Sequence, residues 1–487
     1  MAKARRELSR HSENKWIILA LLAMAQFMVV LDVTIVNIAL PSMARQLHFA
    51  TSSLQWVVTA YTITFGGFLL LGGRAADLYG RRKIFIGAVA AFSAMSLLCG
   101  LAQNDTWIIL ARAAQGLAGA IMSPAALSIV LTEFKEGRER NTALGVWAAV
   151  AAGGSAVGVL LGGVLTQYLS WRWNFFVNVP VGILVVLAAI RLLPHHEGEE
   201  NKKIKLDLPG AVSVTAGLMA LVFGLSKAPQ DGWGSGTVIG FLVAAVVLLI
   251  AFIFNERRAE QPLMPLSIFR IRNVAGGNAT ALAIACTLFS MFFFMTLYVQ
   301  TVLNYSPIKS GISFLPVTIV IAFTSAFVSK TVGKVGYKPF LVAGPIFLAI
   351  GLFTIAHIMK VGGAYWQNVF PGLVLIALGM GCSFISMTLA STSGVPKHFS
   401  GLASGILNTS QQVGGAIGLA ILSAVYASTF NSNLANHTSQ NLSKIHGYQA
   451  GLHVGVGLAI VAAIVAFLVV KNQKVTNPEE AMQVAPG

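Results

Sequence analysis

Long apolar runs restrict what this chain can fold into more than any other feature. There are fourteen of them, each 19 to 30 residues long, separated by shorter polar segments. A helix of about 20 residues crosses the hydrocarbon core of a bilayer, and a helix satisfies all of its own backbone amides there. We therefore predict an all-α integral membrane protein with 14 transmembrane helices. The runs lie at 16–40, 53–73, 84–103, 107–133, 141–167, 175–193, 208–227, 236–254, 274–303, 311–331, 338–358, 366–390, 401–430 and 450–470.

The net charge of +16 follows a membrane topology and does not indicate a nucleic-acid-binding protein. When the N-terminus is placed in the cytoplasm, six of the 33 basic residues fall in outer segments, Arg112 falls inside a run and 26 remain on the cytoplasmic side. This asymmetry is the positive-inside rule. It predicts an even number of spans with both termini in the cytoplasm. The outer basic residues are Arg45, Arg172, Lys227, Lys309, Lys360 and Lys444.

Two polar segments interrupt the regular spacing of the runs. Residues 194–207 are charged, and residues 255–273 contain Pro262 and Pro265. They bracket the seventh and eighth runs, so six runs precede this pair and six follow it. We predict two six-helix lobes with an inserted hairpin and a substrate site between the lobes near the middle of the membrane. The predicted units are a first lobe at 1–193, the hairpin with its cytoplasmic linkers at 194–273, a second lobe at 274–471 and a polar tail at 472–487.

Asp32 is an isolated carboxylate inside the first apolar run. An acid there costs about 2.5–3.5 kcal/mol on insertion scales, so such a residue usually serves a proton, an ion or a cationic substrate. The fourth run carries Arg112, Gln115 and Gly116 on one helical face. An arginine inside the membrane needs an acceptor, and Asp32 is the candidate. The alternative is that Arg112 only ties helices together through backbone carbonyls.

Residues 73–83, between the second and third runs, form a short loop dense in glycine and charge. Its aspartate could cap the following helix or pair with a cation of the turn. We predict a cytoplasmic gate at this loop, with a solvated loop as the alternative. The predicted gate residues are Gly73, Asp77, Gly80, Arg81 and Arg82.

Glycines recur on the fifth run at a spacing of four residues. Small residues at this spacing let two helices pack backbone to backbone. We interpret the stripe as plain packing, and we expect this same packing contact to be made and broken as the two lobes rock. The glycines of this stripe are Gly154, Gly158, Gly162 and the adjacent Gly163.

Two further helix faces are candidates for a substrate cavity. The ninth run is rich in aromatic residues, and the thirteenth carries side-chain amides. Each pattern is as compatible with helix packing as with a cavity lining, so packing and substrate binding both stay open for these two faces. The candidate cavity residues are Phe289, Phe292, Phe293, Gln300, Asn408 and Gln412.

Motifs of other protein classes are absent from the sequence. There is no Gly-Lys-Ser/Thr phosphate-binding loop, so direct coupling to ATP is not expected. No spacing of His, Cys or acids predicts a metal site, and no nucleophilic triad predicts an enzyme. A non-transporting sensor would need a larger soluble domain. We expect no metal and no cofactor, and we interpret the three cysteines, all within apolar runs, as packing residues.

Four motifs make the chain resemble the major facilitator superfamily and, within it, the fourteen-span drug:proton antiporters of the EmrB/QacA type. Residues 31–41 (LDVTIVNIALP) are similar to that family's first-span signature, and residues 73–83 resemble the superfamily loop motif. Residues 112–116 (RAAQG) resemble the fourth-span motif, and residues 171–182 (WRWNFFVNVPVG) resemble the entry to the sixth span. The resemblance covers nearly the whole chain.

The resemblance implies a role for each motif. Asp32 would be the proton and cation site with Arg112 as its electrostatic partner, the loop would be the cytoplasmic gate, and the glycine stripe would be the antiporter motif. The chain departs from the family pattern at Val159, where a proline is usual, and at Ala75 and Leu78 in the loop. The second half has no carboxylate in a predicted span, which does not favour multivalent cations as substrates.

We therefore expect a proton-coupled secondary transporter of the inner (cytoplasmic) membrane that expels hydrophobic or cationic small molecules by alternating access. The proton motive force would drive it, because protonation of Asp32 would loosen its hold on Arg112 or on a cationic substrate. We expect a monomer surrounded by membrane lipid, with no nucleic-acid partner, and leave a periplasmic adaptor open. The alternatives are an exporter of an endogenous metabolite or lipid and a proton-coupled uptake symporter.

Overall fold

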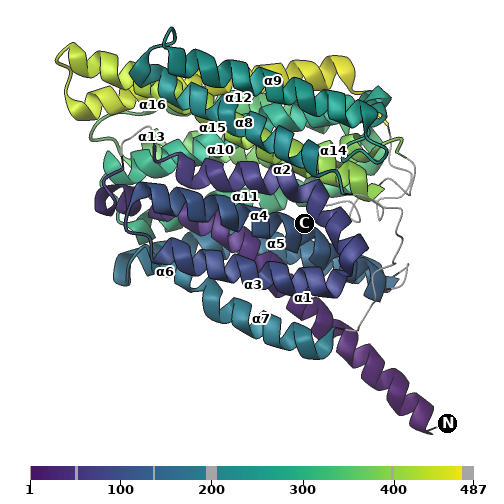
Figure 1. The fold of residues 1–487 in the computed structure, drawn as a ribbon. Helices are drawn as coiled ribbons and strands as arrows, with labels where there is room; N and C mark the ends of the chain where they lie inside the picture. The colour runs from purple at the N-terminus through teal and green to yellow at the C-terminus, as the bar shows by residue number, and fades with distance from the viewer. Residues whose placement is uncertain (1, 50–52, 135–137, 194–205, 396–399, 474–487) are drawn as a thin grey trace.

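The computed structural model describes residues 2–49, 53–134, 138–193, 206–395 and 400–473 (Figure 1). Every regular element within these residues is a helix. In chain order the elements are α1 (Ala2–Gln46), α2 (Trp56–Tyr79), α3 (Arg81–Gly100), α4 (Asp105–Glu133), α5 (Arg138–Tyr168), α6 (Trp173–Phe176), α7 (Asn178–Leu192), α8 (Leu208–Asp231), α9 (Gly236–Arg258), the 3₁₀ helix η1 (Leu266–Arg270), α10 (Arg272–Thr301), α11 (Pro307–Val335), α12 (Lys338–Ile358), α13 (Tyr365–Asn368), α14 (Phe370–Thr392), α15 (Ser400–Ala435) and α16 (Gln440–Val469).

Thirteen helical segments of the described residues are long and apolar enough to cross a membrane. They coincide with thirteen of the fourteen predicted runs, and the short helix α6 joins α7 in one of them. The run at 141–167 falls in α5, a helix of 31 residues that is outside this set. The all-helical membrane architecture is confirmed, and the count of fourteen spans stays a prediction.

The helices pack in two groups with a hairpin beside them. In the group that we call the first lobe, α1 to α7, α2 packs on α4, α1 on α5, and α3 on α4 and α7. In the second lobe, α10 to α16, α12 packs on α14 and α16, and α10 on α15 and α16. Helices α8 and α9 pack on each other, and α8 contacts both α2 and α15 (Figure 1). The hairpin therefore lies along one side of the junction between the lobes.

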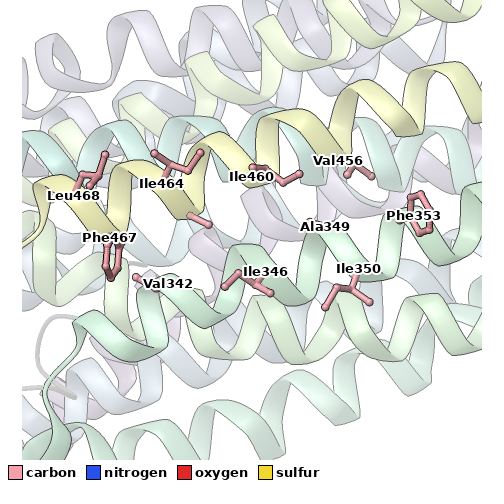
Figure 2. A pocket seen from close by; sticks show the side chains of 11 residues that line it. Val342, Ile346, Ala349, Ile350, Phe353, Val456, Ile460, Ile464, Phe467 and Leu468 are labelled. Carbon is pink, nitrogen blue, oxygen red and sulfur yellow. The ribbon is translucent and has the colours of Figure 1, made fainter.

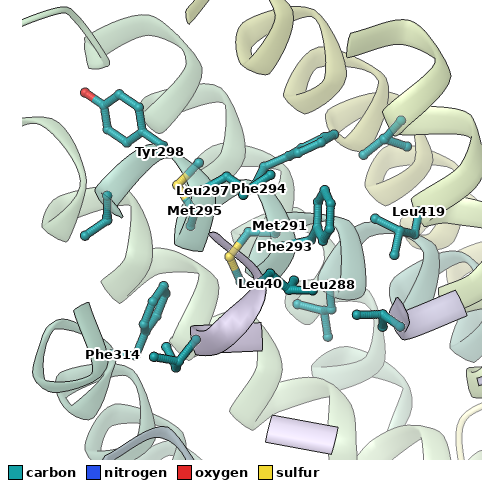
Figure 3. Close-up of a cluster of buried hydrophobic side chains, with 14 of the residues drawn as sticks. Leu40, Leu288, Met291, Phe293, Phe294, Met295, Leu297, Tyr298, Phe314 and Leu419 are labelled. Atoms are coloured by element: carbon teal, nitrogen blue, oxygen red, sulfur yellow. The ribbon is translucent and has the colours of Figure 1, made fainter. Parts of the chain in front are cut away.

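The two ends of the bundle differ in how the lobes meet. We call the end at which α1 begins and α16 finishes the terminal end, and the opposite end the distal end. In the distal half, one cluster of buried apolar side chains joins Leu40 of α1 to Met291 and Phe293 of α10 (Figure 3). In the terminal half, the first lobe has its own cluster around Trp147 and the second lobe another around Tyr337. A smaller cluster of α2, α8 and α15 connects the lobes along one side.

Hydrogen bonds also cross between the lobes in the distal half. Gln300 Nε2 of α10 donates to the Ile38 carbonyl oxygen of α1 at 2.9 Å. The Ile308 amide of α11 donates to Gln167 Oε1 of α5 at 3.2 Å. Helices α5 and α11 approach closely at Gly163, where a Cβ would lie 2.7 Å from the Ile308 Cα. The distal end is therefore sealed by apolar packing, backbone contact and polar ties together.

Replacing Gln300 by Ala removes the polar tie from α10 to α1. We expect the distally closed conformation to lose population by a factor of about 5, because a hydrogen bond contributes about 1 kcal/mol. Labelling of a cysteine introduced in place of Ile308 with a membrane-impermeant maleimide measures this change, since the three native cysteines are buried.

The matched control is Gln449→Ala, which removes a 2.9 Å bond to the Ala356 carbonyl oxygen within the second lobe. This variant should leave labelling at position 308 unchanged. Equal labelling of the two variants would contradict the assignment of Gln300 as a tie between the lobes.

Candidate functional site

Asp32 lies in α1 and is completely enclosed, with 0% of its surface exposed. Its Oδ2 accepts a hydrogen bond from Arg112 Nη1. Its Oδ1 accepts from Gln115 Nε2 at 2.9 Å and from Asn178 Nδ2 at 3.3 Å. One carboxylate is thus held by three polar side chains from α4 and α7.

Arg112 on α4 is 1% exposed, and its guanidinium connects three helices. Besides Asp32 of α1, its Nε donates to the Val57 carbonyl oxygen of α2 at 3.0 Å, and Nη1 donates to Gln115 Oε1 at 2.9 Å. The guanidinium also lies over the ring of Tyr61, 4.2 Å from its centroid. Arg112 therefore pairs with Asp32 and also ties α2 through a backbone carbonyl, so backbone carbonyls are not its sole partners, and its role in proton coupling stays a prediction.

Gly116 brings α2 and α4 close enough for this network to form. A Cβ at Gly116 would lie 2.3 Å from both Thr64 Oγ1 and the Tyr61 carbonyl oxygen. At this crossing Thr64 Oγ1 donates to the Ala113 carbonyl oxygen at 2.8 Å. The close approach places Tyr61 against the guanidinium of Arg112, one turn from Gly116 on the same helical face.

Three members of the network carried no prediction: Asn178, Ser96 and Tyr61. Asn178 Nδ2 also donates to Ser96 Oγ at 3.1 Å, and Ser96 Oγ donates to the Phe175 carbonyl oxygen at 2.9 Å. Asn178 was detectable as an amide inside an apolar run, within the motif at 171–182. Ser96 and Tyr61 are ordinary residues of membrane helices and give no comparable signal.

The charges of this network depend on each other. Removing a carboxylate or a guanidinium from water costs several kcal/mol for each ion, and pairing with full hydrogen bonding offsets that cost. A proton added to Asp32 would leave Arg112 charged and without a counter-charge. Because neither side chain is exposed, Asp32 does not face an open passage in this conformation. Proton exchange at Asp32 would therefore require the surrounding helices to move.

The predicted gate residues come together at the terminal end of α2. Arg81 Nη2 lies 2.9 Å from Asp77 Oδ1, and Ser128 Oγ of α4 donates to the same oxygen at 3.5 Å. Arg82 Nη2 donates to a backbone carbonyl oxygen of α7 at 2.5 Å. The partners that the structure describes for these residues all lie in the first lobe. The loop is therefore not fastened to the second lobe by these residues here.

The two glycines of the gate motif differ in what they do. Gly80 has φ of 92°, a left-handed conformation that a glycine adopts readily, and it forms the sharp turn between α2 and α3. Gly73 faces Pro124 of α4, but a Cβ there would make only an ordinary contact at 3.7 Å. The backbone conformation thus requires a glycine at position 80 and not at position 73.

Most of the glycine stripe on α5 faces the first lobe itself. A Cβ on Gly162 would lie 3.0 Å from the Ile35 carbonyl oxygen of α1, whereas Gly163 faces α11. The expectation that the stripe forms and breaks contact between the lobes is therefore wrong for three of its four members, because the spacing of four keeps them on one helical face. The glycines that face α1 are Gly154, Gly158 and Gly162.

The α10 candidates for a substrate cavity are packing and sealing residues in this conformation. Phe293 is buried in the distal cluster (Figure 3), and Gln300 forms the tie to α1. Phe292 lies against Phe314 of α11, with ring centroids 5.9 Å apart. Phe289 faces α15, where a Cβ on a glycine would lie 2.7 Å from its ring. These contacts favour the packing interpretation for this face.

On α15, Gln412 packs against Gly66 of α2, and Asn408 lies half-buried one turn before it. Figure 2 shows a groove at a different place, between α12 and α16, with a volume of about 720 Å³. Its lining is apolar and includes Ile346, Ile350 and Phe467, all exposed on the side of the bundle. None of the six predicted cavity residues lines this groove.

Comparison with known proteins decides the family. Residues 22–419 match the sequence profile of the Major Facilitator Superfamily. The chain belongs to this superfamily. Its members are secondary transporters, so the protein is a transporter and not an enzyme.

Three similar relatives are named for antibiotic resistance or export. The chain is 41% identical to the puromycin resistance protein pur8 of Streptomyces alboniger, over 84% of this chain and 81% of that protein. It is 40% identical to the cephamycin export protein CmcT of Amycolatopsis lactamdurans, over 83% of each. It is 33% identical to the tetracenomycin C resistance and export protein of Streptomyces glaucescens, over 84% of this chain and 76% of that protein.

Solved structures show the same fold at low sequence identity. The POT family transporter PepTSo matches with a TM-score of 0.68 and 16% identity, covering 94% of this chain and 97% of that chain. A bacterial homologue of the human lysosomal transporter Spinster, in an inward-facing and unoccupied conformation, matches with a TM-score of 0.67 and 16% identity, covering 94% and 97%. These likenesses concern the fold alone.

Replacing Gly162 by Ala places a methyl group against the backbone of α1. We expect this change to lower the stability of the folded protein by about 1–3 kcal/mol, as overpacking usually does. The control is Gly153→Ala on the same helix, where a Cβ meets nothing within 4 Å and alanine favours the helix. Melting temperatures of both variants in detergent measure the difference, and equal values would contradict the packing assigned to α1 and α5.

Neutralising either member of the buried pair should destabilise the protein by about 3–5 kcal/mol, because the remaining charge has no counter-charge. The two single variants are Asp32→Asn and Arg112→Gln. The double variant should lose less stability than the sum of the single losses. Thermal unfolding of the three purified variants tests this, and additive losses would show that the pair does not form.

Proposed function

We propose that the protein is a proton-coupled exporter of hydrophobic or cationic small molecules, including antibiotics, and a fourteen-span drug:proton antiporter. The observation that carries this proposal is the enclosed Asp32–Arg112 network in the first lobe of a superfamily transporter. An ionisable pair inside a membrane bundle is costly and usually marks a proton or ion pathway. The names of the relatives, which concern resistance and export, support the outward direction.

The distribution of basic residues supports a cytoplasmic terminal end, in the cytoplasmic membrane. On this assignment the distal seal closes the protein toward the outside. In the terminal half the larger clusters of the two lobes are separate, but Leu70 of α2 packs with Ile406 of α15, and Thr409 Oγ1 of α15 donates to the Gly66 carbonyl oxygen of α2 at 3.2 Å. The lobes would have to part at these contacts before cargo could enter from the cytoplasm.

Helix α1 provides the mechanical connection between the proton site and the distal seal. Ile38 follows Asp32 by six residues, or about 9 Å along a helix, and its carbonyl accepts the bond from Gln300. Between them Ile35 packs on Gly162 of α5. A change of charge at Asp32 would shift α1 relative to α4 and would act directly on the tie between the lobes.

The exchange cycle follows from this connection. With the distal end open, an external proton neutralises Asp32 and releases its hold on Arg112, and the cargo leaves outward. With the terminal end open, the proton leaves to the cytoplasm and the pair forms again. The structure pairs Asp32 with Arg112, which favours this route over direct binding of a cationic cargo by Asp32. The proton motive force supplies the energy, and a monomer in membrane lipid suffices for the cycle.

Export of an endogenous metabolite is the second candidate. Two of the relatives are named as exporters of particular antibiotics, cephamycin and tetracenomycin C. The same fold and the same charged pair would serve such a narrow substrate. Uptake by symport is not favoured, because the relatives' names concern resistance and export.

Inverted membrane vesicles test the coupling and the direction. With an imposed proton gradient, the unmodified protein should accumulate a fluorescent lipophilic cation or puromycin, while Asp32→Asn should fall to the level of vesicles without the protein. The control is Asp231→Asn, an exposed acid at the distal end of α8, which should transport normally.

A probe panel that includes a cephamycin distinguishes broad efflux from metabolite export. Transport of one chemical class alone would favour the second candidate. Normal gradient-driven transport by Asp32→Asn would reject the proposed coupling, and accumulation that requires the opposite gradient would reject export.

A further inference from the structure

The groove between α12 and α16 has no part in the exchange cycle described above. It runs along the side of the second lobe, from Phe467 and Leu468 toward the terminal end to Phe353 and Val456 toward the distal end (Figure 2). Both helices are long and apolar enough to cross a membrane. When they do so, the groove opens toward the lipid around the bundle.

The groove has a floor of small side chains and walls of large ones. Ala349 of α12 and Ala463 of α16 line it and are only 8% and 9% exposed. The walls include Ile346, Ile350 and Ile460, all of which are exposed. An apolar hollow left without atoms would lose dispersion contacts along its whole lining. A flexible apolar chain is therefore the occupant that suits it.

The length of the groove matches one leaflet of a bilayer. Phe353 follows Val342 by 11 residues, so the lining extends about 17 Å along α12 at about 1.5 Å per residue. One leaflet is half of a hydrocarbon core of about 30 Å, or about 15 Å. Val342 lies one turn after the start of α12, so the matching leaflet is the one at the terminal end.

A positive charge stands at the terminal end of the groove. Lys338 is the first residue of α12, and its Nζ lies 5.2 Å from the ring centroid of Phe467, a lining residue. Its backbone amide donates to Asn472 Oδ1, just after α16, at 3.1 Å. Within the described residues, Lys338 forms no ion pair with an acid. Its charge is therefore available to a ligand that enters the groove.

Two further cations lie at the same end. Arg272 donates from Nε and Nη2 to the carbonyl oxygens of Val469 and Leu468, at 2.7 and 2.6 Å. The Lys471 amide donates to Asn273 Oδ1, beside Arg272, at 2.8 Å. Both basic residues are exposed. The end of α16 thus brings three positive charges to one end of an apolar groove.

The second lobe contains no carboxylate to neutralise these cations. The sequence has neither Asp nor Glu from residue 261 to residue 478, a stretch that includes all of α10 to α16. A counter-charge for this end of the groove has to come from another part of the chain or from a ligand. A phospholipid carries its phosphate at the membrane surface and its acyl chain below, in the same order as the cations and the groove.

We propose that this groove binds one anionic phospholipid of the membrane, with an acyl chain between α12 and α16 and the phosphate at Lys338, Arg272 and Lys471. On the topology proposed above, the lipid belongs to the cytoplasmic leaflet, where basic pockets between helices bind anionic headgroups. The proposal goes beyond the exported substrate and does not depend on what that substrate is.

Native mass spectrometry of the full-length, delipidated protein tests the headgroup contact. Phosphatidylglycerol and phosphatidylcholine with the same palmitoyl and oleoyl chains are added separately, and phosphatidylglycerol should bind more tightly. Lys338→Gln should weaken its binding about 5-fold, because a basic residue near the membrane surface contributes about that factor. Binding of phosphatidylcholine should stay unchanged, and inorganic phosphate should not be retained because it lacks the chain.

The matched control is Lys309→Gln. Lys309 also lies over an aromatic ring of the second lobe, with Nζ 3.8 Å from the Tyr305 centroid, but at the distal end. This variant should bind phosphatidylglycerol like the unmodified protein. Equal affinities of Lys338→Gln and Lys309→Gln for phosphatidylglycerol would overturn the headgroup assignment, and so would retention of inorganic phosphate at the expense of the lipid.

Filling the groove tests the chain contact. Ala463→Leu raises the floor and should weaken the binding of both lipids, because the acyl chain loses its space. Ile346→Trp, at an exposed wall, fills the groove without displacing a buried side chain and gives the same test if Ala463→Leu does not fold. The control is Ala251→Leu on the exposed face of α9, which should change nothing.

Two results would overturn the groove assignment. One is unchanged binding of phosphatidylglycerol in a folded filling variant, with folding verified by the melting temperature in detergent. The other is a dimer that forms without lipid and is broken by Ile346→Trp, since a second copy of the chain would then occupy the groove.

Discussion

A carboxylate and a guanidinium that share one enclosed site organise the first lobe. Asp32 and Arg112 have almost no contact with solvent, and the surrounding amides and backbone carbonyl come from helices far apart in sequence. Neither charge is tolerable without the other. A change in the charge of one would have to be answered by a movement of the helices that bear them, which is why we propose Asp32 as the site at which a proton acts on the conformation.

The second lobe meets the first, at the distal junction, through packing and neutral hydrogen bonds. Three parts of the second lobe contact the first lobe: the apolar face of α10, the backbone of α11 where it approaches Gly163, and the side-chain amide of Gln300. Such contacts are strong only when the surfaces fit closely, so a small displacement of α1 can weaken several of them together. On the function proposed here, the charged pair in one lobe and the close-packed contacts of the other would together serve alternating access.

The hairpin is more than an insertion between the lobes. Helix α8 contacts both α2 and α15, and the Gln261 carbonyl oxygen of the segment that follows α9 accepts a hydrogen bond from Arg74, a residue of the loop motif at 73–83. Asp77 and Arg81 of that motif bind each other within the first lobe, so Arg74 provides the described connection from the motif toward the segment that leads to α10.

The sequence by itself determined the helical membrane architecture, because long apolar runs have no other stable form in lipid, and it indicated the pairing of Asp32 with Arg112, because a membrane arginine needs an acceptor. It did not determine which neighbour each helical face meets. Gly162 turned out to face α1 and Gln300 to tie the lobes, while Tyr61 joined the charged network without any sequence signal. Periodicity defines a face of a helix, but only the packing of the other helices decides what that face contacts.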